Sequence, residues 1–315
     1  MRLDKRHRNF RTIIGFLICG AAIIGVALSQ QHNSINFQVN FSKLAYKIIN
    51  QILLNPFFYL ITLVTLYLEA LFPARKEQQT FSLGLFQDSF WLISDITLRT
   101  LFIYTFLNGF SHFLSQIPGI ELLSLKELPN IWRVVFGILA ADLFTWFSHV
   151  LRHKIPVLWS FHAVHHSQRE LNLFSDLRFH GIDLLVGLAF AVMPLALFDL
   201  SLPTAATYIF IQRWYVRIYH ANLRTNLGAL RYVLVTPQSH RIHHSIEPQH
   251  HDKNFATLFS VWDFIFQTQY LSFDEYPVTG ITDPDFPLES RKGFLPLLRN
   301  YYLQNWYPFQ KILRQ

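Results

Sequence analysis

Histidine is the residue type in this sequence whose number and spacing indicate chemistry. The chain contains 15 histidines, and twelve of them lie between His149 and His251. Three groups have the i, i+3 or i, i+4 spacing that places imidazole rings on one face of a helix. These groups are His149-x3-His153, His162-x2-His165-His166 and His240-x2-His243-His244. Two isolated histidines, His180 and His220, stand between the second and third groups. This part of the chain is therefore a candidate metal site.

The number of imidazoles predicts more than one metal ion. The three groups supply eight rings, and His180 and His220 would raise the total to ten. A catalytic zinc needs only three protein ligands, so eight to ten nitrogens suit two ions with positions left open for oxygen. Imidazole binds iron, zinc, copper and nickel alike. We favour two iron ions, because a membrane-embedded cluster of this size suits oxygen chemistry on lipids better than hydrolysis. Cys19 is the only cysteine in the sequence, which excludes a cysteine-rich cluster.

The other five histidines are predicted to lie outside the metal site. His7, His32 and His112 are isolated, and a lone histidine is usually a surface residue or a hydrogen-bonded core residue. His250 and His251 are adjacent in a polar segment, and we expect them in a loop or behind the ligands.

Asp142 is the acidic residue best placed to support a ligand. It precedes His149 by seven residues, which is two turns on the same helix face. A carboxylate inside an apolar helix is costly unless it has a partner, and orienting a metal-bound histidine through its second ring nitrogen would provide one. The alternative is a hydrogen bond that packs two helices. Asp176, Asp183 and Asp263 are weaker candidates for the same role.

The elements that must position these residues are predicted to be membrane helices. Hydrophobic residues make up 51% of the chain and charged residues only 15%, against about 25% charged in soluble domains. The candidate spans are residues 12–28, 52–72, 90–110, 131–150, 182–198 and 202–219. The first is predicted to be a retained anchor, with a signal peptide that ends near residue 29 as the alternative. The predicted fold class is an all-α integral membrane protein with about four to six transmembrane helices.

The basic residues predict which side of the membrane carries the histidines. Arg75-Lys76 follows the second apolar run and further arginines follow the last one, and segments rich in lysine and arginine stay on the cytoplasmic side. The runs 182–198 and 202–219 are close enough together to predict a helical hairpin. The histidines before this hairpin and those after it then lie at the same, cytoplasmic face. They can therefore meet at one site.

The order of these motifs is similar to that of the fatty acid hydroxylase / sterol desaturase superfamily. The matching features, between residues 84 and 270, are Asp142, the three histidine groups, Trp159, Arg178-x-His180, His220-x-Asn222, Pro237, and the closing segment Asn254 to Gln269 with Trp262-Asp263. Gly181 stands where many relatives have proline, and Phe266-Gln267-Thr268 replaces a common Phe-Gly-Thr. Neither departure falls within a histidine group.

The resemblance implies a role for the matched residues. The implied metal ligands are His149, His153, His162, His165, His166, His240, His243 and His244, with His220 and His180 as further candidates. Asp142, Asn222 and Asp263 are predicted to lie directly behind the ligands. The implied protein is an integral membrane, non-haem di-iron enzyme that uses O₂ and two external electrons to hydroxylate or desaturate a lipid C–H bond. Hydroxylation is favoured, because more branches of the superfamily end in an alcohol.

Domain limits and partners complete the prediction. The predicted regions are a membrane-anchor region (residues 1–83), a catalytic region (residues 84–270) and a tail (residues 271–315) that is amphipathic or extended and lies against the protein or the membrane surface. Because the sequence contains no Gly-rich nucleotide motif and no cysteine cluster, we expect electrons from a separate reductase, ferredoxin or cytochrome, or from a pterin. The chain has a net charge of +7, and its basic cytoplasmic face could bind an acidic electron donor or anionic lipid headgroups. The alternative is that these basic residues only set the orientation of the helices in the membrane. No nucleic-acid partner is expected.

Two other classes of protein are alternatives to this predicted function. A zinc-dependent membrane hydrolase would be expected to carry an HExxH motif, but Val150 follows His149 and Lys154 follows His153. A metal transporter or sensor would be expected to place its ligands near the middle of its spans, whereas these histidines lie at predicted span ends.

Overall fold

The computed structural model describes residues 56–116, 127–198, 200 and 202–314. Within these ranges the backbone forms helices and loops, with no β-strand and two isolated β-bridges, Pro73 with Leu223 and Ser245 with Thr279. The prediction of an all-helical fold is confirmed for this part of the chain. The apolar run at residues 12–28 lies outside the described residues, as do His7 and His32.

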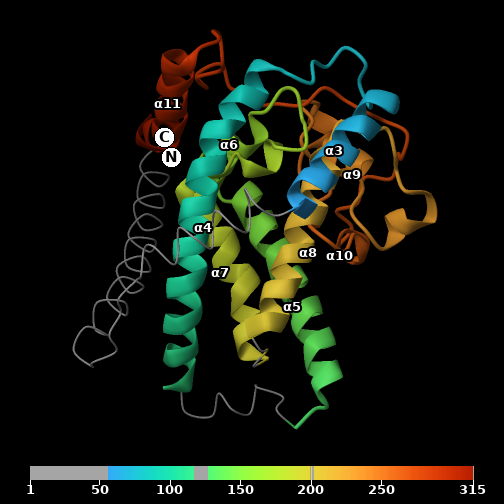
Figure 1. The fold of residues 1–315 in the computed structure, drawn as a ribbon, viewed down its shortest axis with the longest axis vertical. Helices are drawn as coiled ribbons and strands as arrows, with labels where there is room; N and C mark the ends of the chain where they lie inside the picture. The colour runs from blue at the N-terminus through green and yellow to red at the C-terminus, as the bar shows by residue number, and fades with distance from the viewer. Residues whose placement is uncertain (1–55, 117–126, 199, 201, 315) are drawn as a thin grey trace, which may run out of the picture.

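Five helices correspond to the remaining predicted apolar runs. They are α3 (Pro56–Leu71), α4 (Leu83–Ser115), α5 (Asn130–Lys154), α7 (Gly181–Leu197) and α8 (Leu202–His220). Helices α4, α5, α7 and α8 run along the long axis of the molecule, with α7 packed against both α4 and α5 (Figure 1). Tyr208 of α8 packs against Ala141 of α5 and Leu195 of α7 in a buried apolar cluster. An apolar cluster therefore joins α5, α7 and α8.

Length and hydropathy identify one helix that could cross a membrane. Among the described residues, Asn130–Lys154 is the only helix both long and apolar enough to do so. The segments Tyr59–Leu71 and Gly181–Leu195 are apolar but shorter. The number of membrane spans and the side on which the histidines lie therefore stay predictions.

Shorter helices gather near one end of these long helices (Figure 1). They are α6 (Pro156–His166), α9 (Pro237–His243) and α10 (Val261–Ile265), with 3-10 turns η4 (Ser175–Leu177), η5 (Gly228–Tyr232) and η6 (Pro248–His250). Helix α6 packs against α5, and α9 packs against α8. This end of the molecule contains all three histidine motifs.

The C-terminal region packs onto this same end. Helix α11 (Phe294–Arg314) contacts α6 and α4, so the predicted amphipathic tail lies against the protein (Figure 1). A buried ion cluster attaches the segment before α11. Arg178 Nε lies 2.6 Å from Asp88 Oδ1 of α4, and Arg178 Nη1 lies 2.7 Å from Glu289 Oε1 of the tail. By pairing with two carboxylates, this buried guanidinium joins three distant parts of the chain.

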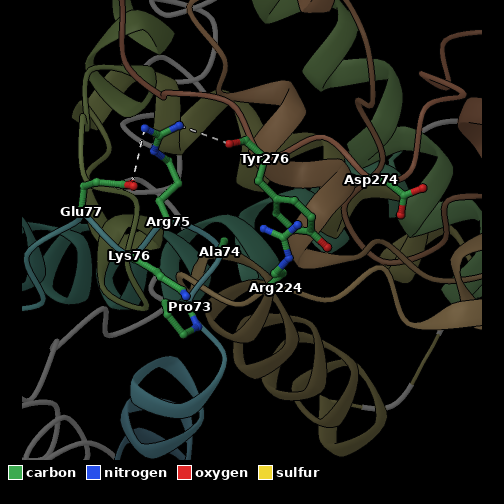
Figure 2. A pocket seen from close by; sticks show the side chains of 8 residues that line it. All are labelled: Pro73, Ala74, Arg75, Lys76, Glu77, Arg224, Asp274 and Tyr276. Atoms are coloured by element: carbon green, nitrogen blue, oxygen red, sulfur yellow. Dashed lines mark hydrogen bonds and ion pairs between the residues drawn. The ribbon is translucent and has the colours of Figure 1, made fainter.

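A cavity of about 530 Å³ lies beyond the C-terminal end of α3 (Figure 2). It is lined by residues 73–77 on one side and by Arg224, Asp274 and Tyr276 on the other. The backbone N–H of Arg224 donates to the carbonyl of Phe72 at 2.8 Å, which fixes the two walls to each other.

Candidate metal centre

Helix ends place the first two histidine motifs. His149 and His153 lie on the last two turns of α5, which ends where Ile155 adopts extended backbone before Pro156. A residue before proline avoids the helical conformation, and proline fits the first turn of a new helix, so the chain turns here. Helix α6 begins at this proline and carries the second motif along its last turns.

A capping box places the third motif. The Thr236 side chain accepts a hydrogen bond from the backbone N–H of Ser239, and the Ser239 side chain contacts the backbone of Thr236 in return. Pro237 occupies the first helical position. These features fix the start of the seven-residue helix α9, so His240, His243 and His244 follow at a defined distance near its C-terminal end.

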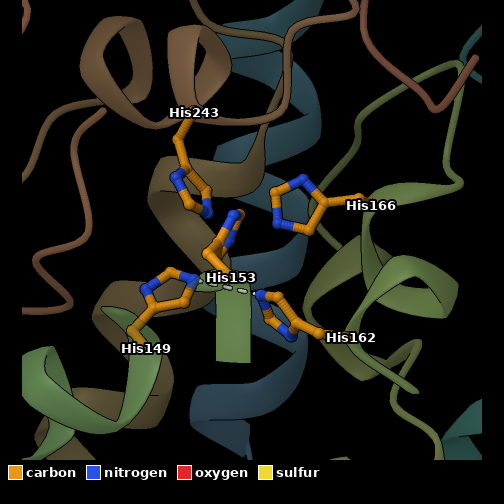
Figure 3. Close-up of side chains that lie close together, drawn as sticks. All are labelled: His149, His153, His162, His166 and His243. Carbon is orange, nitrogen blue, oxygen red and sulfur yellow. Dashed lines mark hydrogen bonds between the residues drawn. The ribbon is translucent and has the colours of Figure 1, made fainter. Parts of the chain in front are cut away.

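Nine histidines converge in two groups. The first, which we call the five-histidine group, consists of His149, His153, His162, His166 and His243 (Figure 3). The second, which we call the four-histidine group, consists of His165, His220, His240 and His244. Within each group the candidate ligand nitrogens lie within 4.8 Å of one another. The two groups adjoin, since the rings of His166 and His244 stack with centroids 4.3 Å apart.

The spacing inside each motif decides which group a ring joins. The i, i+4 pairs that share a group are His149/His153, His162/His166 and His240/His244. His165 and His243, at the i+3 positions, each join the other group. Because positions i and i+4 lie one above the other while i+3 is rotated to the side, each HxxHH motif contributes to both groups.

Lone pairs face each other in the five-histidine group. His149 Nδ1 lies 2.7 Å from the carbonyl oxygen of Phe255, and His162 Nδ1 lies 3.0 Å from Asp183 Oδ2. Both oxygens are acceptors, so each Nδ1 is assigned the proton and each neutral ring presents an unprotonated Nε2. These two Nε2 atoms are only 3.1 Å apart. A cation between them would convert this repulsion into coordination.

The four-histidine group shows the same convergence. His220 Nδ1 donates to the carbonyl of Val216 at 2.7 Å, which leaves His220 Nε2 unprotonated. That nitrogen lies 2.9 Å from His240 Nε2, and His240 Nε2 lies 3.0 Å from His244 Nε2. His165 Nε2 lies 3.4 Å from His220 Nε2. One proton cannot satisfy all of these contacts, because each N–H donates to one partner.

Several ring nitrogens in both groups are buried without a hydrogen-bond partner among the described residues. They are His153 Nε2, His166 Nε2, His243 Nε2, His165 Nδ1, His240 Nδ1 and His244 Nδ1. Buried polar atoms are almost always paired, and a cluster of exceptions needs a cause. A pair of metal ions would account for the unpaired nitrogens that point into the groups. The donor set therefore fits two cations bound through imidazole.

Burial keeps these rings neutral. It lowers the pKa of His165, His166, His240 and His244 well below the usual value for histidine, and neighbouring histidines lower it further. Burial also lowers the pKa of His243 to about 3, although its hydrogen bond to the Lys253 carbonyl favours the charged form. Metal binding requires the neutral ring, so at neutral pH these rings are in the form that can bind a metal ion.

Asp183 is the carboxylate that orients a histidine in this centre. Its Oδ2 accepts from His162 Nδ1, and its Oδ1 lies 3.3 Å from Nη1 of Arg152. The side chains of Asp183 and Arg152 are both buried, so this ion pair holds the His162 ring in place. Asp183 lies in the first turn of α7, where the sequence marked it only as a weaker candidate.

Asp142 and Asp263 shape the loop that closes the centre. Asp142 accepts from Phe259 N at 3.0 Å and from Trp262 Nε1 at 2.9 Å, so it packs the loop onto α5 and does not orient a histidine. Asp263 accepts from the backbone N–H groups of Phe255 and Ala256, both at 2.9 Å. It thereby fixes the Phe255 carbonyl to which His149 donates. Asp142 lies on the same helix face as His149, as predicted, but it makes no hydrogen bond to that ring. The Phe255 carbonyl accepts from His149 instead, and Asp183 accepts from His162.

Asn222 lies beside the centre and connects it to the cavity of Figure 2. Its Oδ1 accepts from Arg241 Nη2 at 3.0 Å and from Arg75 N at 3.1 Å, and its Nδ2 donates to the Arg75 carbonyl at 3.0 Å. Its own backbone N–H donates to Glu69 of α3 at 2.7 Å. Asn222 therefore ties α3 to the chain just after His220 rather than contacting a histidine ring.

Three other histidines lie outside both groups. His180 Nδ1 accepts from the Ile182 N–H at 3.1 Å, and its ring packs against Phe161, 4.8 Å between centroids. His250 is buried between Ser245 and Glu275, at 2.8 and 3.1 Å. His251 is exposed. Of the ten histidines predicted as ligands, the structure gathers nine, and His180 is the one it leaves apart.

A cavity of about 300 Å³ opens onto the five-histidine group. His153, His166 and His243 form one side of it, and the tail residues Gly280 to Asp283 and Tyr307 form the other. The Tyr307 hydroxyl donates to Asp283 at 2.9 Å, which holds this wall together. One of the two groups is therefore accessible from outside.

The fold and the site together define a class of protein: its described residues form helices and loops around a buried centre of imidazoles suited to two metal ions. Residues 134–268 match the model of the fatty acid hydroxylase family. This segment includes all nine histidines of the two groups. The match confirms the resemblance to the fatty acid hydroxylase superfamily predicted from the motifs.

Several curated proteins are similar over the same part of the chain. An ornithine lipid hydroxylase from Rhizobium tropici is 31% identical over 172 residues, which cover 55% of this chain and 51% of that protein. The alkylglycerol monooxygenases of Homo sapiens and Danio rerio are 32% and 34% identical, over 50% of this chain and 34% and 35% of their own lengths. The chain thus spans about half of the first relative and about a third of the others. No solved structure matches this chain.

Proposed function

We propose that this protein is a membrane-bound, non-haem di-iron oxygenase that hydroxylates a C–H bond of a lipid. The observation that carries the proposal is the pair of adjoining histidine groups in which unprotonated nitrogens face one another. The superfamily resemblance and the names of the similar proteins, lipid hydroxylase and alkylglycerol monooxygenase, support an oxygenase and a lipid substrate.

Each histidine group would hold one iron ion. Two iron ions bound there supply the activation of O₂ and the cleavage of an unactivated C–H bond. The chain's own contribution is to keep the rings neutral by burial, to fix His162 through Asp183, and to fix His149 through the Phe255 carbonyl. The five-histidine group would supply five imidazoles to one ion, and the four-histidine group would supply four to the other.

The lipid and the membrane location belong to the same proposal. Helix α5 is long and apolar enough to span a bilayer, and it delivers His149 and His153 at its C-terminal end. Basic residues near this end, including Arg152 and Lys154, favour the cytoplasmic side. The centre would then lie close to the interface, where a lipid tail bends in from the bilayer. Electrons would come from a separate donor protein or from a pterin.

Metal analysis of the purified full chain tests the proposal. After anaerobic reconstitution with ferrous iron, we expect two iron ions per chain, and on exposure to O₂ with a chemical reductant a lipid extract should gain products heavier by one oxygen atom. Products that have only lost two hydrogen atoms would assign desaturation instead. Stoichiometric zinc with no bound iron would overturn the proposal in favour of a hydrolase, a transporter or a sensor.

A matched pair of variants links the iron to the centre. His165→Ala removes a ring from the four-histidine group and should lower the iron content and abolish product formation. His251→Ala removes an exposed histidine that lines the cavity beside the five-histidine group but belongs to neither group, so it should leave the iron content unchanged. Equal loss of iron in both variants would show that the metal is not held by these groups.

A further inference from the structure

The cavity beyond α3 is lined by more cations than the anions present can neutralise. Arg75, Lys76 and Arg224 line it together with Glu77 and Asp274 (Figure 2). Glu77 lies 3.6 Å from Arg75, and the Asp274 carboxylate points away from the other lining side chains. Among the described residues, no carboxylate lies within ion-pair distance of Lys76 or Arg224. The cavity therefore suits an anion.

The cavity is preformed. The Arg224 guanidinium lies over the Tyr276 ring at 4.8 Å, so its position is fixed by an aromatic face. The Arg75 guanidinium donates to the Tyr276 carbonyl at 3.5 Å. The backbone of Arg75 is held on both sides by the Asn222 side chain. Because the fold already holds these basic side chains in place, little conformational entropy is lost when an anion binds between them.

An exposed apolar strip on α3 leads directly into this cavity. Its members have i, i+3 and i+4 spacing along one side of the helix and include Phe72, the residue just after it: Leu60, Leu63, Val64, Tyr67, Leu68, Leu71 and Phe72. The opposite face is held inward by the buried Thr65 and Glu69. At 1.5 Å per residue the strip is about 18 Å long, close to the roughly 15 Å of hydrocarbon in one leaflet. The next residue, Pro73, is the first that lines the cavity.

We propose that this cavity binds the phosphate of an anionic phospholipid whose acyl chains lie along the α3 strip. A soluble phosphate would bind the basic side chains but leave the apolar strip exposed to water. A phospholipid would place its phosphate in the cavity and its acyl chains on the strip that leads into it. Asn222 holds the cavity wall at Arg75 and also contacts Arg241, the neighbour of His240. The bound lipid would thus fix the segment that carries His240 and His244 of the four-histidine group. The inference rests on the membrane location in the proposed function but not on the metal.

Lipid retention by the purified full chain tests this site. Native mass spectrometry after exchange from nanodiscs of phosphatidylcholine mixed with phosphatidylglycerol should show phosphatidylglycerol retained in preference. Lys76→Ala and Arg224→Ala should each weaken retention about fivefold, the usual effect of one basic residue on anionic lipid. Lys76→Arg should restore it, because the charge is kept.

Lys292→Ala is the matched control. Arg291-Lys292 is a second exposed arginine–lysine pair, outside the cavity, and its variant should retain lipid like the unchanged chain. Equal loss in Lys292→Ala would overturn the proposal in favour of diffuse surface charge. Displacement of the lipid by inorganic phosphate, or equal retention of the two phospholipids, would overturn it as well. The iron content of each preparation is measured separately, so a failure here is distinguishable from a failure of the oxygenase proposal.

Discussion

The two histidine groups differ in how their rings are held. In the five-histidine group, three rings donate from Nδ1 to protein oxygens: two backbone carbonyls and the Asp183 carboxylate. In the four-histidine group His220 donates to a backbone carbonyl, whereas Nδ1 of His165, His240 and His244 has no partner among the described residues. Hydrogen bonds to Nδ1 fix a ring before metal arrives. The five-histidine group is therefore preorganised, and the four-histidine group would depend more on a bound ion for its arrangement.

The groups also differ in access. The five-histidine group borders the cavity that the tail lines on its other side, and His153 in this group is half-buried. All four rings of the other group are buried. An ion in the five-histidine group should consequently exchange faster, although its ligands are better fixed. Preorganisation and exchange rate are separate properties.

Removal of one ring from each group should give the largest effects. His240→Ala and His243→Ala should both abolish product formation, because each removes a ligand that one ion needs. His240→Ala should also lower the thermal stability more, since the remaining rings of its group have fewer protein partners. Iron analysis and thermal unfolding measure the two effects. Activity retained in either variant, or a larger loss of stability in His243→Ala, would contradict the comparison.

Asp183→Asn should weaken metal binding in the five-histidine group. Loss of the charged acceptor leaves His162 free to rotate or change tautomer, which typically costs about 10–100-fold in metal affinity. Titration of the metal-free protein with ferrous iron should then resolve one weakened site and one unchanged site. If both sites weaken equally, the two groups act as a single unit and the distinction between them fails.

Acid should destabilise the metal-free protein. The pKa of His243 is about 3 in the folded chain and 6.5 as its ordinary value, so below about pH 6 the unfolded chain binds a proton that the folded chain excludes. Stability is complete above pH 6.5 and falls as the pH drops toward 3, by about 1.4 kcal/mol per pH unit for this one ring. Denaturant unfolding at several pH values measures the slope. Iron bound to the neutral ring further disfavours its protonation in the folded chain, so with iron the slope should continue below pH 3. A slope that ends at the same pH with and without iron would argue against these rings as ligands.

Asp142→Asn should have the smallest effect and leave iron binding unchanged. The carboxylate accepts hydrogen bonds from the 257–262 loop, and weakening them should cost about 1–2 kcal/mol of folding stability. Denaturant unfolding and iron titration of the same variant separate the two properties. A loss of iron affinity comparable to that of Asp183→Asn would give Asp142 the orienting role after all.

The helices and the histidine motifs could be predicted from the sequence because both depend on short-range spacing. Five apolar runs correspond to α3, α4, α5, α7 and α8, and nine of the ten candidate ligands come together. The partner of each carboxylate could not be predicted in this way. Asp183 lies 21 residues from His162, and Asp142 lies 120 residues from Trp262, so only the packing of distant helices selects these contacts.

His180 illustrates the limit most clearly. Its place in the Arg178-x-His180 motif made it a candidate ligand, yet it packs against Phe161 and caps the start of α7, while Arg178 joins Asp88 to Glu289. A sequence motif shows that residues occur near one another in the chain, but not that their side chains face the same site. The i, i+4 spacing that selects a helix face does not apply across a turn.

The sequence by itself determined that this protein is helical and apolar and carries three histidine motifs, since helix periodicity and residue type are local properties of the chain. The tertiary structure alone decided that the rings divide into groups of five and four, that Asp183 rather than Asp142 orients a ring, and that a basic cavity continues an apolar strip on α3. These features depend on where helices distant in sequence cross. Their positions are set by burial of the apolar core and by satisfaction of buried polar groups, which no local pattern encodes.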